Sequence, residues 1–285
     1  MDQSDPFHLF PYRAIVDHPP VAWPNGAHVA VWVIPNIEHF HWEIGNAAPD
    51  VRNHSRRDYG NRVGVWQLME VMEKNGVRGT VALNGEVGKY YPRIMAECAR
   101  LKWELMGHGL TNSVMLSGLP KDKEAAVIAQ TKGIIEGLGQ TMRGWLGPGL
   151  TETWETPDLL KQEGYDYVAD WVLDDQPVWL KTTTTPIVNV PYTQECNDVA
   201  MMLIQHHTAS EYYDRAIDQF EQIYGDAADS ARVMALVVHP YIMGVPHRLK
   251  YFRRIFETIR KNSDVAFMTG EQILDWYLSV GPKAP

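Results

Sequence analysis

The chain has little cysteine and no excess of basic residues, and each shortage excludes a class of protein. Its 285 residues include two cysteines, Cys98 and Cys196, which are far apart and form no Cys-x-x-Cys pair. A disulfide framework and a cysteine-rich zinc site are therefore excluded. Lys and Arg number 26 against 35 Asp and Glu, so the formal charge is −9. Nucleic-acid and anionic-membrane binders need a basic face, so neither partner is expected.

The chain also lacks a long hydrophobic run. No stretch approaches the roughly 18 apolar residues of a membrane span. The N-terminal segment Met1–Pro11 is polar and carries Asp2 and Asp5, without the basic and apolar regions of a signal peptide. These features favour a cytoplasmic protein with no membrane partner.

Aromatic side chains and histidine are abundant instead, with 10 Trp, 13 Tyr and 11 His. Aromatic residues at this density fill a large core or line a pocket for a small, flat or apolar ligand. Composition alone leaves both interpretations open. With 285 residues, the chain is long enough to bury a core that needs no disulfide or structural metal.

Short apolar, β-branched runs alternate with segments of helical periodicity through the whole chain. The predicted strands are His28–Pro35, Val77–Asn84, Trp103–Gly107, Met142–Leu146, Tyr165–Trp171, Ile187–Val190, Ala231–His239 and Val265–Thr269. The predicted helices are one from Val63 to an end at Asn75–Gly76, Pro92–Leu101, Lys121–Leu138, a short one between Thr156 and Gly164, Ser210–Tyr224, His247–Asn262 and Glu271–Val280. This alternation indicates parallel pairing, and seven or eight such units suit one closed or nearly closed (β/α) barrel. A doubly wound open sheet is the alternative.

No linker or low-complexity stretch divides the chain. This predicts a single barrel domain over residues 25–285 after an N-terminal extension over residues 1–24. The first predicted strand leads into Pro35-Asn36-Ile37-Glu38 and not into a glycine-rich loop, which counts against a dinucleotide-binding Rossmann fold. One α/β domain is therefore the expected fold class.

Polar side chains recur after nearly every predicted strand. They are Asn36 and Glu38, Asn84, His108 and Asn112, Asp170 and Trp171, Tyr192, and His239. Each has a structural explanation by itself, because a single His is usually a hydrogen-bonded structural residue and an Asp can cap a loop. The carboxyl ends of parallel strands converge, however, so these groups are expected to meet in one polar cavity. Such a cavity suits general acid–base chemistry or metal binding.

Glu38 and His108 are the first candidates for a metal site, since both residue types bind first-row metals. Asn112 lies four residues after His108, on the same side if that turn is helical. Asn is a poor zinc ligand compared with His or Cys. The site is therefore expected to hold either one divalent metal such as zinc, or no metal, with Glu38 and a His moving protons.

The strand ends also offer groups for acid catalysis and for oxyanion binding. His239 stands between an apolar strand and a proline, which predicts a rigid imidazole able to protonate a leaving nitrogen. Gly147 and Gly149 can bring backbone N–H groups towards a developing oxyanion, although a Gly/Pro run is most often only a turn. Trp145 and Trp171 fit either the core or a pocket for a planar ring.

In their order along the chain, these motifs resemble the polysaccharide deacetylase (NodB-homology) superfamily. The counterparts are Asn36-Ile-Glu38, His108-x-x-x-Asn112, the loop Gly144–Gly149, Asp170–Trp171 and Val238–His239. The resemblance covers nearly the whole chain and implies a distorted (β/α) barrel. It departs from the family at Asn36, where the family has a general-base Asp, and at Asn112, where the family has a second metal-binding His. Both departures count against sugar deacetylation by the usual mechanism.

Within the superfamily, the chain is more similar to the branch that contains metal-independent allantoinases and bacterial cyclic imide hydrolases. Three segments carry that likeness, Asp58-Tyr-Gly-Asn-Arg62-Val-Gly, Pro191-Tyr-Thr-Gln-Glu-Cys-Asn-Asp198 and His239-Pro-Tyr-Ile-Met-Gly-Val-Pro-His-Arg248. The resemblance implies a hydrolase that opens a small cyclic amide, such as a cyclic imide, a hydantoin or an allantoin-like ring, with activated water. The alternatives are a polysaccharide or peptidoglycan N-deacetylase and a non-catalytic, metabolite-binding barrel.

This interpretation gives each candidate residue an expected role. Glu38 activates or positions the water, His239 is the acid, and Asp170 orients a His or binds a substrate N–H. The expected substrate-binding residues are Asn36, Trp145, Gly147, Trp171, Tyr192 and Arg248. The ligands of a metal, if one is bound, are Glu38, His108 and Asn112. Arg143 is a further candidate for binding a carboxylate, with surface ion pairing as the alternative. By analogy with relatives of this branch, the protein is expected to form a homo-oligomer.

Overall fold

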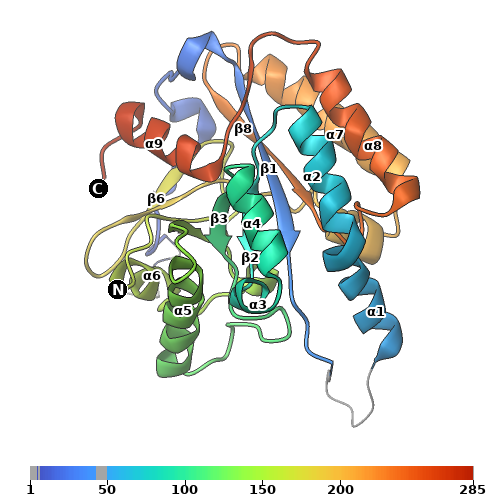
Figure 1. The fold of residues 1–285 in the computed structure, drawn as a ribbon. Helices are drawn as coiled ribbons and strands as arrows, with labels where there is room; N and C mark the ends of the chain where they lie inside the picture. The colour runs from blue at the N-terminus through green and yellow to red at the C-terminus, as the bar shows by residue number, and fades with distance from the viewer. Residues whose placement is uncertain (1–4, 6, 43–49, 285) are drawn as a thin grey trace.

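The computed structural model describes residue 5, residues 7–42 and residues 50–284, which form a curled α/β sheet covered by helices (Figure 1). The described residues form nine strands, which are β1 (Val29–Ile37), β2 (Thr80–Leu83), β3 (Glu104–Gly107), β4 (Met142–Trp145), β5 (Tyr167–Val168), β6 (Val178–Leu180), β7 (Ile187–Asn189), β8 (Arg232–Val238) and β9 (Val265–Phe267). Their order is β6-β7-β5-β4-β3-β2-β1-β8, and β9 also pairs with β1. All pairs are parallel except β6 with β7. The predicted distorted (β/α) barrel is confirmed. Among the described strands, β6 and β8 are the two edges of the sheet and do not pair with each other.

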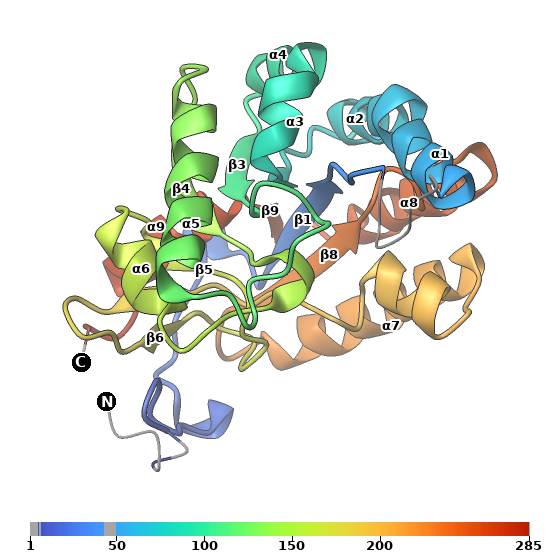
Figure 2. The ribbon, with the colours of Figure 1, turned by 90° about the horizontal axis from the view of Figure 1, so that it is seen from below.

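The helices lie around the outside of the curled sheet, as the view from below shows (Figure 2). They are α1 (Val51–Tyr59), α2 (Val65–Lys74), α3 (Gly85–Tyr90), α4 (Pro92–Arg100), α5 (Lys121–Glu136), α6 (Thr156–Gln162), α7 (Ala209–Asp226), α8 (Pro246–Ile259) and α9 (Gly270–Val280). Two π-helical turns, Gly60–Gly64 and Val199–Ile204, lie among them. No helix in the described part of the chain combines the length and the apolar character needed to cross a bilayer.

The strand β1 is buried along its whole length and divides the core into two clusters. Val31 and Val33 pack in the larger cluster, with residues of α2 and α8. Trp32 and Ile34 point the other way, into a smaller cluster inside the curl that α9 closes. Because both faces are buried, the strand is a continuous apolar run, and burial of each such side chain contributes roughly 1.5–3 kcal/mol.

The structure differs from the predicted elements mainly at one edge of the sheet. β5 is shorter than the predicted strand Tyr165–Trp171, and β6 was not predicted. β6 is antiparallel to β7 and needs no crossover helix, so the alternation of strands and helices does not reveal it. The helix α1 was also missed, because none of its residues is buried and it therefore lacks an apolar stripe.

The predicted N-terminal extension contributes to packing in its described part. Trp23 stacks on Trp276 of α9, with ring centroids 3.8 Å apart, and Leu9 is buried. Residues 1–4 and 6 of this extension lie outside the described residues. The domain boundary at residue 24 stays a prediction.

Candidate active site

The candidate site lies at the carboxyl ends of β1, β3 and β8. Glu38 directly follows β1, His108 follows β3, and His239 follows β8. Their side chains meet, because Nε2 of His108 and Nε2 of His239 each lie 3.5 Å from Oε1 of Glu38. All three residues are buried, with 7% or less of each exposed. The structure therefore brings together three of the polar groups that the sequence placed at strand ends.

Further hydrogen bonds fix the orientation of both imidazoles. Nδ1 of His108 lies 2.7 Å from the carbonyl oxygen of Leu146, which can only accept, so Nδ1–H is the donor. Nδ1 of His239 lies 2.6 Å from Oδ1 of Asp198, and the backbone N–H of His239 donates to Oδ2 of the same carboxylate at 2.8 Å. Both rings therefore direct Nε2 at Glu38.

The charges in this cluster stabilise one another. Burial raises the pKa of Glu38, but the charge of His239 and hydrogen bonds from both imidazoles outweigh it and lower this pKa to about 2. Burial lowers the pKa of His239, and the charges of Glu38 and Asp198 outweigh it and raise this pKa to about 10. Near neutral pH, His239 is therefore an imidazolium that faces a carboxylate. Oε2 of Glu38 is buried without a hydrogen-bond partner among the described residues, so it can accept one from water or substrate.

The amide of Asn112 completes the surroundings of Glu38, and it faces Glu38 as a donor. Oδ1 of Asn84 accepts the N–H of His39, so Nδ2 of Asn84 faces the other way and donates to Oδ1 of Asn112. Nδ2 of Asn112 consequently donates to Oε1 of Glu38. In this orientation Asn112 turns its NH₂ group to Glu38, and an NH₂ group cannot bind a cation, so the structure does not support the predicted role of Asn112 as a ligand. Glu38 and His108 alone are fewer than the three protein ligands of a catalytic zinc site, so the set does not fit a divalent metal.

Asp170 follows β5 and lies close enough to the cluster for the charge of His108 to lower its pKa. Its Oδ1 accepts the N–H of Gly147 at 2.7 Å, while Oδ2 is buried without a partner among the described residues. Burial is the larger effect and raises the pKa of Asp170 to about 6. Burial and the charge of Asp170 also raise the pKa of the neighbouring Glu152 well above its usual range. The two buried carboxyl groups therefore influence each other's pKa.

Two predicted substrate-binding groups are used elsewhere. The N–H of Gly147 is not free to bind an oxyanion, and a Cβ at this position would collide with the carbonyl of Thr151, which explains the glycine. Trp145 is fully buried in the larger core cluster and packs edge-on against Tyr165. Side chains alternate along β4, so Leu146, and not Trp145, faces the inside of the curl.

The remaining predicted residues surround the cluster. Asn36 and Tyr192 are buried. Burial raises the pKa of Tyr192, and the charges of Glu38 and Asp170 raise it further, which puts the phenol among these carboxylates. Trp171 is half-buried, and its Nε1–H donates to Oε2 of Glu152 at 3.0 Å. The substrate-binding roles of these residues stay predictions.

The chain after His239 packs closely against the π-helical turn Gly60–Gly64, and this packing fixes its position. A Cβ on Gly64, in the π-helical turn after α1, would collide with the carbonyl of Pro240. Tyr241 is held beside His239, with ring centroids 5.7 Å apart. This packing also borders a groove of about 670 Å³, whose lining residues include Arg56, Tyr59, Tyr241, His247 and Arg248.

The sequence did not identify every residue of the site. Asp198 is fully buried and holds His239, yet only its position in a segment of family likeness marked it. Arg143 takes the alternative role that the sequence allowed, since it forms ion pairs with Asp166 at 2.7 Å and Asp275 at 3.0 Å.

The chain is similar to several known proteins in sequence and in fold. A family model described as polysaccharide deacetylase matches residues 57–168. The structure of Puue allantoinase superposes with a TM-score of 0.85 at 20% identity, over 93% of this chain and 95% of that one. A probable polysaccharide deacetylase from Pseudomonas aeruginosa PAO1 superposes with a TM-score of 0.86 at 20% identity, over 96% of this chain and 100% of that one. A peptidoglycan deacetylase of Helicobacter pylori is 22% identical over 274 residues, which are 84% of this chain and 91% of that protein.

These similarities confirm the predicted resemblance to the polysaccharide deacetylase superfamily and its barrel. The family match also supports a hydrolase. At identities below 25%, the superpositions establish the fold and leave the substrate open, because the relatives are named for both allantoin and sugar chemistry.

Proposed function

We propose that this protein hydrolyses a carbon–nitrogen bond of a small cyclic amide, such as a cyclic imide, a hydantoin or an allantoin-like ring. The family match and the superposition on an allantoinase support a hydrolase built on this barrel. The burial of Glu38, His108 and His239 supports a small substrate, since a polymer needs an open groove. The ligand set around Glu38 is incomplete for a metal, which supports a reaction that side chains catalyse without one.

The arrangement of Asp198, His239 and Glu38 carries the proposal. The imidazole lies between two carboxylates, with Nδ1 2.6 Å from Asp198 and Nε2 3.5 Å from Glu38. These charges outweigh the opposing effect of burial and keep His239 protonated, with a pKa raised to about 10. A departing amide nitrogen must be protonated because its anion is a very poor leaving group, and His239 can supply that proton.

Ring opening then follows two steps. Water held at Oε2 of Glu38 attacks the ring carbonyl carbon, and its proton passes to a carboxylate as the tetrahedral intermediate forms. Asp170 suits this acceptance near neutral pH, since burial raises its pKa to about 6. The carbon–nitrogen bond then breaks as the Nε2 proton of His239 passes to the ring nitrogen. The product carries a new carboxyl group and a freed N–H, and the proton on Asp170 restores His239 through solvent.

Turnover of cyclic amides tests the proposal directly. Purified protein is incubated with succinimide, dihydrouracil, hydantoin and allantoin, and ring opening is followed by the loss of ultraviolet absorbance. We expect at least one of the four to be opened, and we expect turnover to persist after dialysis against a chelator. Failure of all four substrates would overturn the proposal.

N-Deacetylation of a sugar polymer is the second candidate, and the names of the bacterial relatives favour it. Acetate release from N-acetylglucosamine oligomers, without opening of any cyclic amide, would establish it in place of the first. A non-catalytic, metabolite-binding barrel would show neither activity. We also propose a homo-oligomer by analogy with the branch, which light scattering after size-exclusion chromatography tests.

A further inference from the structure

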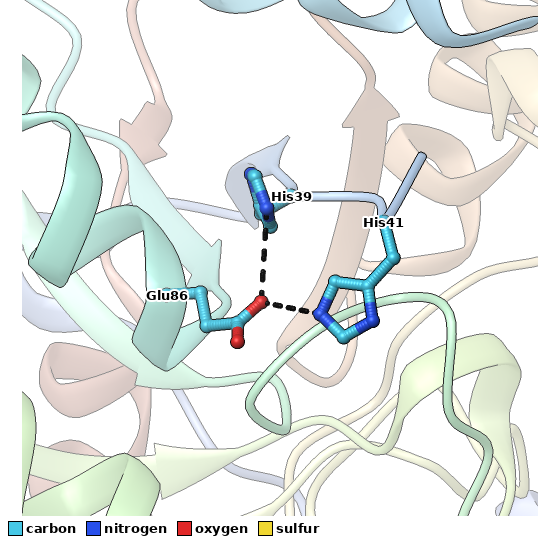
Figure 3. Close-up of side chains that lie close together, drawn as sticks. All are labelled: His39, His41 and Glu86. Atoms are coloured by element: carbon cyan, nitrogen blue, oxygen red, sulfur yellow. Dashed lines mark hydrogen bonds and ion pairs between the residues drawn. The ribbon is translucent and has the colours of Figure 1, made fainter. Parts of the chain in front are cut away.

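His39, His41 and Glu86 form a second group of side chains of metal-binding type, and they take no part in the proposed reaction; Figure 3 shows how the three lie together. His39 and His41 belong to the segment after β1, and Glu86 lies in the first turn of α3. One ligand atom of each residue lies within 4.8 Å of those of the other two. Nε2 of His41 is 2.9 Å, and Nε2 of His39 is 3.7 Å, from Oε2 of Glu86.

These separations suit a small divalent cation. Zinc binds imidazole nitrogen and carboxylate oxygen at about 2.0–2.2 Å in tetrahedral geometry, which sets neighbouring ligand atoms about 3.4 Å apart. The present separations of 2.9 and 3.7 Å lie on either side of that value, so small side-chain movements reach it. The side chain of His41 is 47% exposed, against 17% for His39 and 20% for Glu86, which leaves a fourth position open to water.

The backbone that presents the two imidazoles is already fixed. The N–H of His39 donates to Oδ1 of Asn84 at 2.8 Å, and its carbonyl accepts from the N–H of Asn112 at 3.0 Å. The N–H of His41 donates to the hydroxyl oxygen of Ser113 at 2.9 Å. Ligands held in this way need little reorganisation to bind an ion.

The ring of His39 makes a hydrogen bond through the nitrogen that faces away from Glu86. Its Nδ1 lies 3.3 Å from the hydroxyl of Tyr91, while Nε2 faces Glu86. In metal sites, the second ring nitrogen of a His commonly makes such a bond, which fixes the tautomer and the ring. At 3.7 Å, Nε2 of His39 and the carboxylate of Glu86 are too far apart for a hydrogen bond. A cation between them supplies the attraction that this pair lacks.

We propose that His39, His41 and Glu86 bind one divalent transition-metal ion, with zinc as the best chemical match. The site is separate from the predicted metal ligands Glu38, His108 and Asn112, because it shares no residue with them. An ion here ties the segment after β1 to α3 and so steadies the backbone of Glu38, without touching the reacting atoms. The inference does not rest on the proposed function.

Zinc binding to the full chain tests the proposal. The protein is stripped with a chelator and titrated with ZnCl₂ in a calorimeter, and its melting temperature is measured with and without zinc. We expect one zinc ion per chain and a higher melting temperature in its presence. H41A and E86Q should each lower the affinity at least about tenfold and remove the thermal shift. Co²⁺ should give the visible bands of a tetrahedral ion in the wild type and not in either variant.

Two further variants serve as controls. His207 and Glu211 form an exposed His–carboxylate pair at 3.3 Å, so H207A is a matched change that should leave zinc affinity intact. H108A should also keep zinc, since His108 is not a ligand of the proposed site. Loss of zinc in H108A with retention in H41A and E86Q would overturn the proposal, and so would a wild-type protein that binds no zinc. The contact between His41 and Glu86 would then be an ion pair only. None of these results depends on whether a ring is opened.

Discussion

Two carboxyl groups are buried at opposite ends of the same sheet, and their pKa values shift in opposite directions. Glu38 follows β1 at the carboxyl end, where burial raises its pKa but the charge of His239 and the hydrogen bonds of both imidazoles lower it to about 2. Glu104 begins β3 at the amino end, where burial raises its pKa to about 7. Burial acts on both groups in the same direction, so the partners decide the outcome.

The partners of Glu104 are neutral groups of the fold. Its carboxyl accepts from the hydroxyls of Tyr167 at 2.6 Å and Thr80 at 2.7 Å, and from the N–H of Glu271 at 3.0 Å. Both oxygens are therefore used to join strands to α9. Glu38 instead faces imidazoles and keeps one oxygen without a partner among the described residues. A buried carboxyl therefore suits catalysis where a charged partner keeps it ionised and one oxygen is left for a ligand.

Replacement of Glu38 should remove most of the activity, because Glu38 is the carboxylate that faces both imidazoles. E38Q keeps the size of the side chain but removes the negative charge that holds His239 protonated. We expect kcat for ring opening to fall about 10³-fold, the scale on which acid–base groups contribute. Circular dichroism verifies that the variant is folded. Turnover within tenfold of the wild type would show that Glu38 is not catalytic.

Replacement of Asp198 tests whether the acid needs its outer carboxylate. D198N preserves a hydrogen-bonding oxygen near Nδ1 of His239 but removes one of its two negative neighbours. We expect kcat to fall about 10²-fold. In the wild type, the alkaline limb of the pH–rate profile should lie near 10, the raised pKa of His239, and in D198N it should move to lower pH. An alkaline limb that does not move would assign the acid to another group.

Replacement of Glu104 should lower stability and leave activity unchanged. In E104Q, an NH₂ group replaces one of the two oxygens that accept hydrogen bonds. A buried donor that faced this oxygen then has no acceptor. The free energy of unfolding in urea should fall by about 1–3 kcal/mol. The folded enzyme should keep kcat and KM within about twofold, because Glu104 lies at the far end of the strands. E38Q and E104Q are thus matched controls, and an activity loss in both would remove the distinction between the two ends.

The two carboxyls also predict opposite dependences of stability on pH. Glu104 has a folded pKa of about 7, above its usual 4.5, so its contribution is full below pH 4.5 and is lost as pH rises through 7. Glu38 has a folded pKa of about 2, below 4.5, so its contribution is present above pH 4.5 and is lost as pH falls through 2. Urea unfolding from pH 2 to 8 measures both. In E104Q the decline between pH 4.5 and 7 should be weaker, and an unchanged decline would refute the assignment.

The sequence predicts the fold well where strands are buried on both faces. β1 and β8 are long apolar runs for this reason, and helices with an inward stripe separate the parallel strands. β6 is a three-residue strand with two half-buried positions at the sheet edge, and nothing in its composition marks it. The local hydrophobic pattern therefore predicts a strand where its residues are buried, and it does not predict one where they are only partly buried.

The sequence predicts less of the site, because it gives the positions of residues and not their pairing. Convergent strand ends bring Glu38, His108 and His239 together as expected. Asp198 lies 41 residues from the His that it holds, and the orientation of Asn112 depends on a chain of amide hydrogen bonds. The sequence left core and pocket open for Trp145, because one residue along a strand reverses the direction of the side chain, and the structure places it in the core.

Two arginines lie at the same two ends of the sheet, and their replacement should change function and stability only slightly. Arg143, near the start of β4, is held by ion pairs with Asp166 and Asp275. Arg248 lines the groove beside the active site and donates to the carbonyl of Ile242, with no carboxylate within ion-pairing distance among the described residues. R248A should raise KM about threefold to tenfold with kcat unchanged, since it removes binding common to substrate and transition state. R143A should leave KM unchanged and lower stability by at most about 1 kcal/mol. A change of KM in R143A, and none in R248A, would mean that substrate approaches the amino end of the strands, and Glu38 could not then be the carboxylate that meets it.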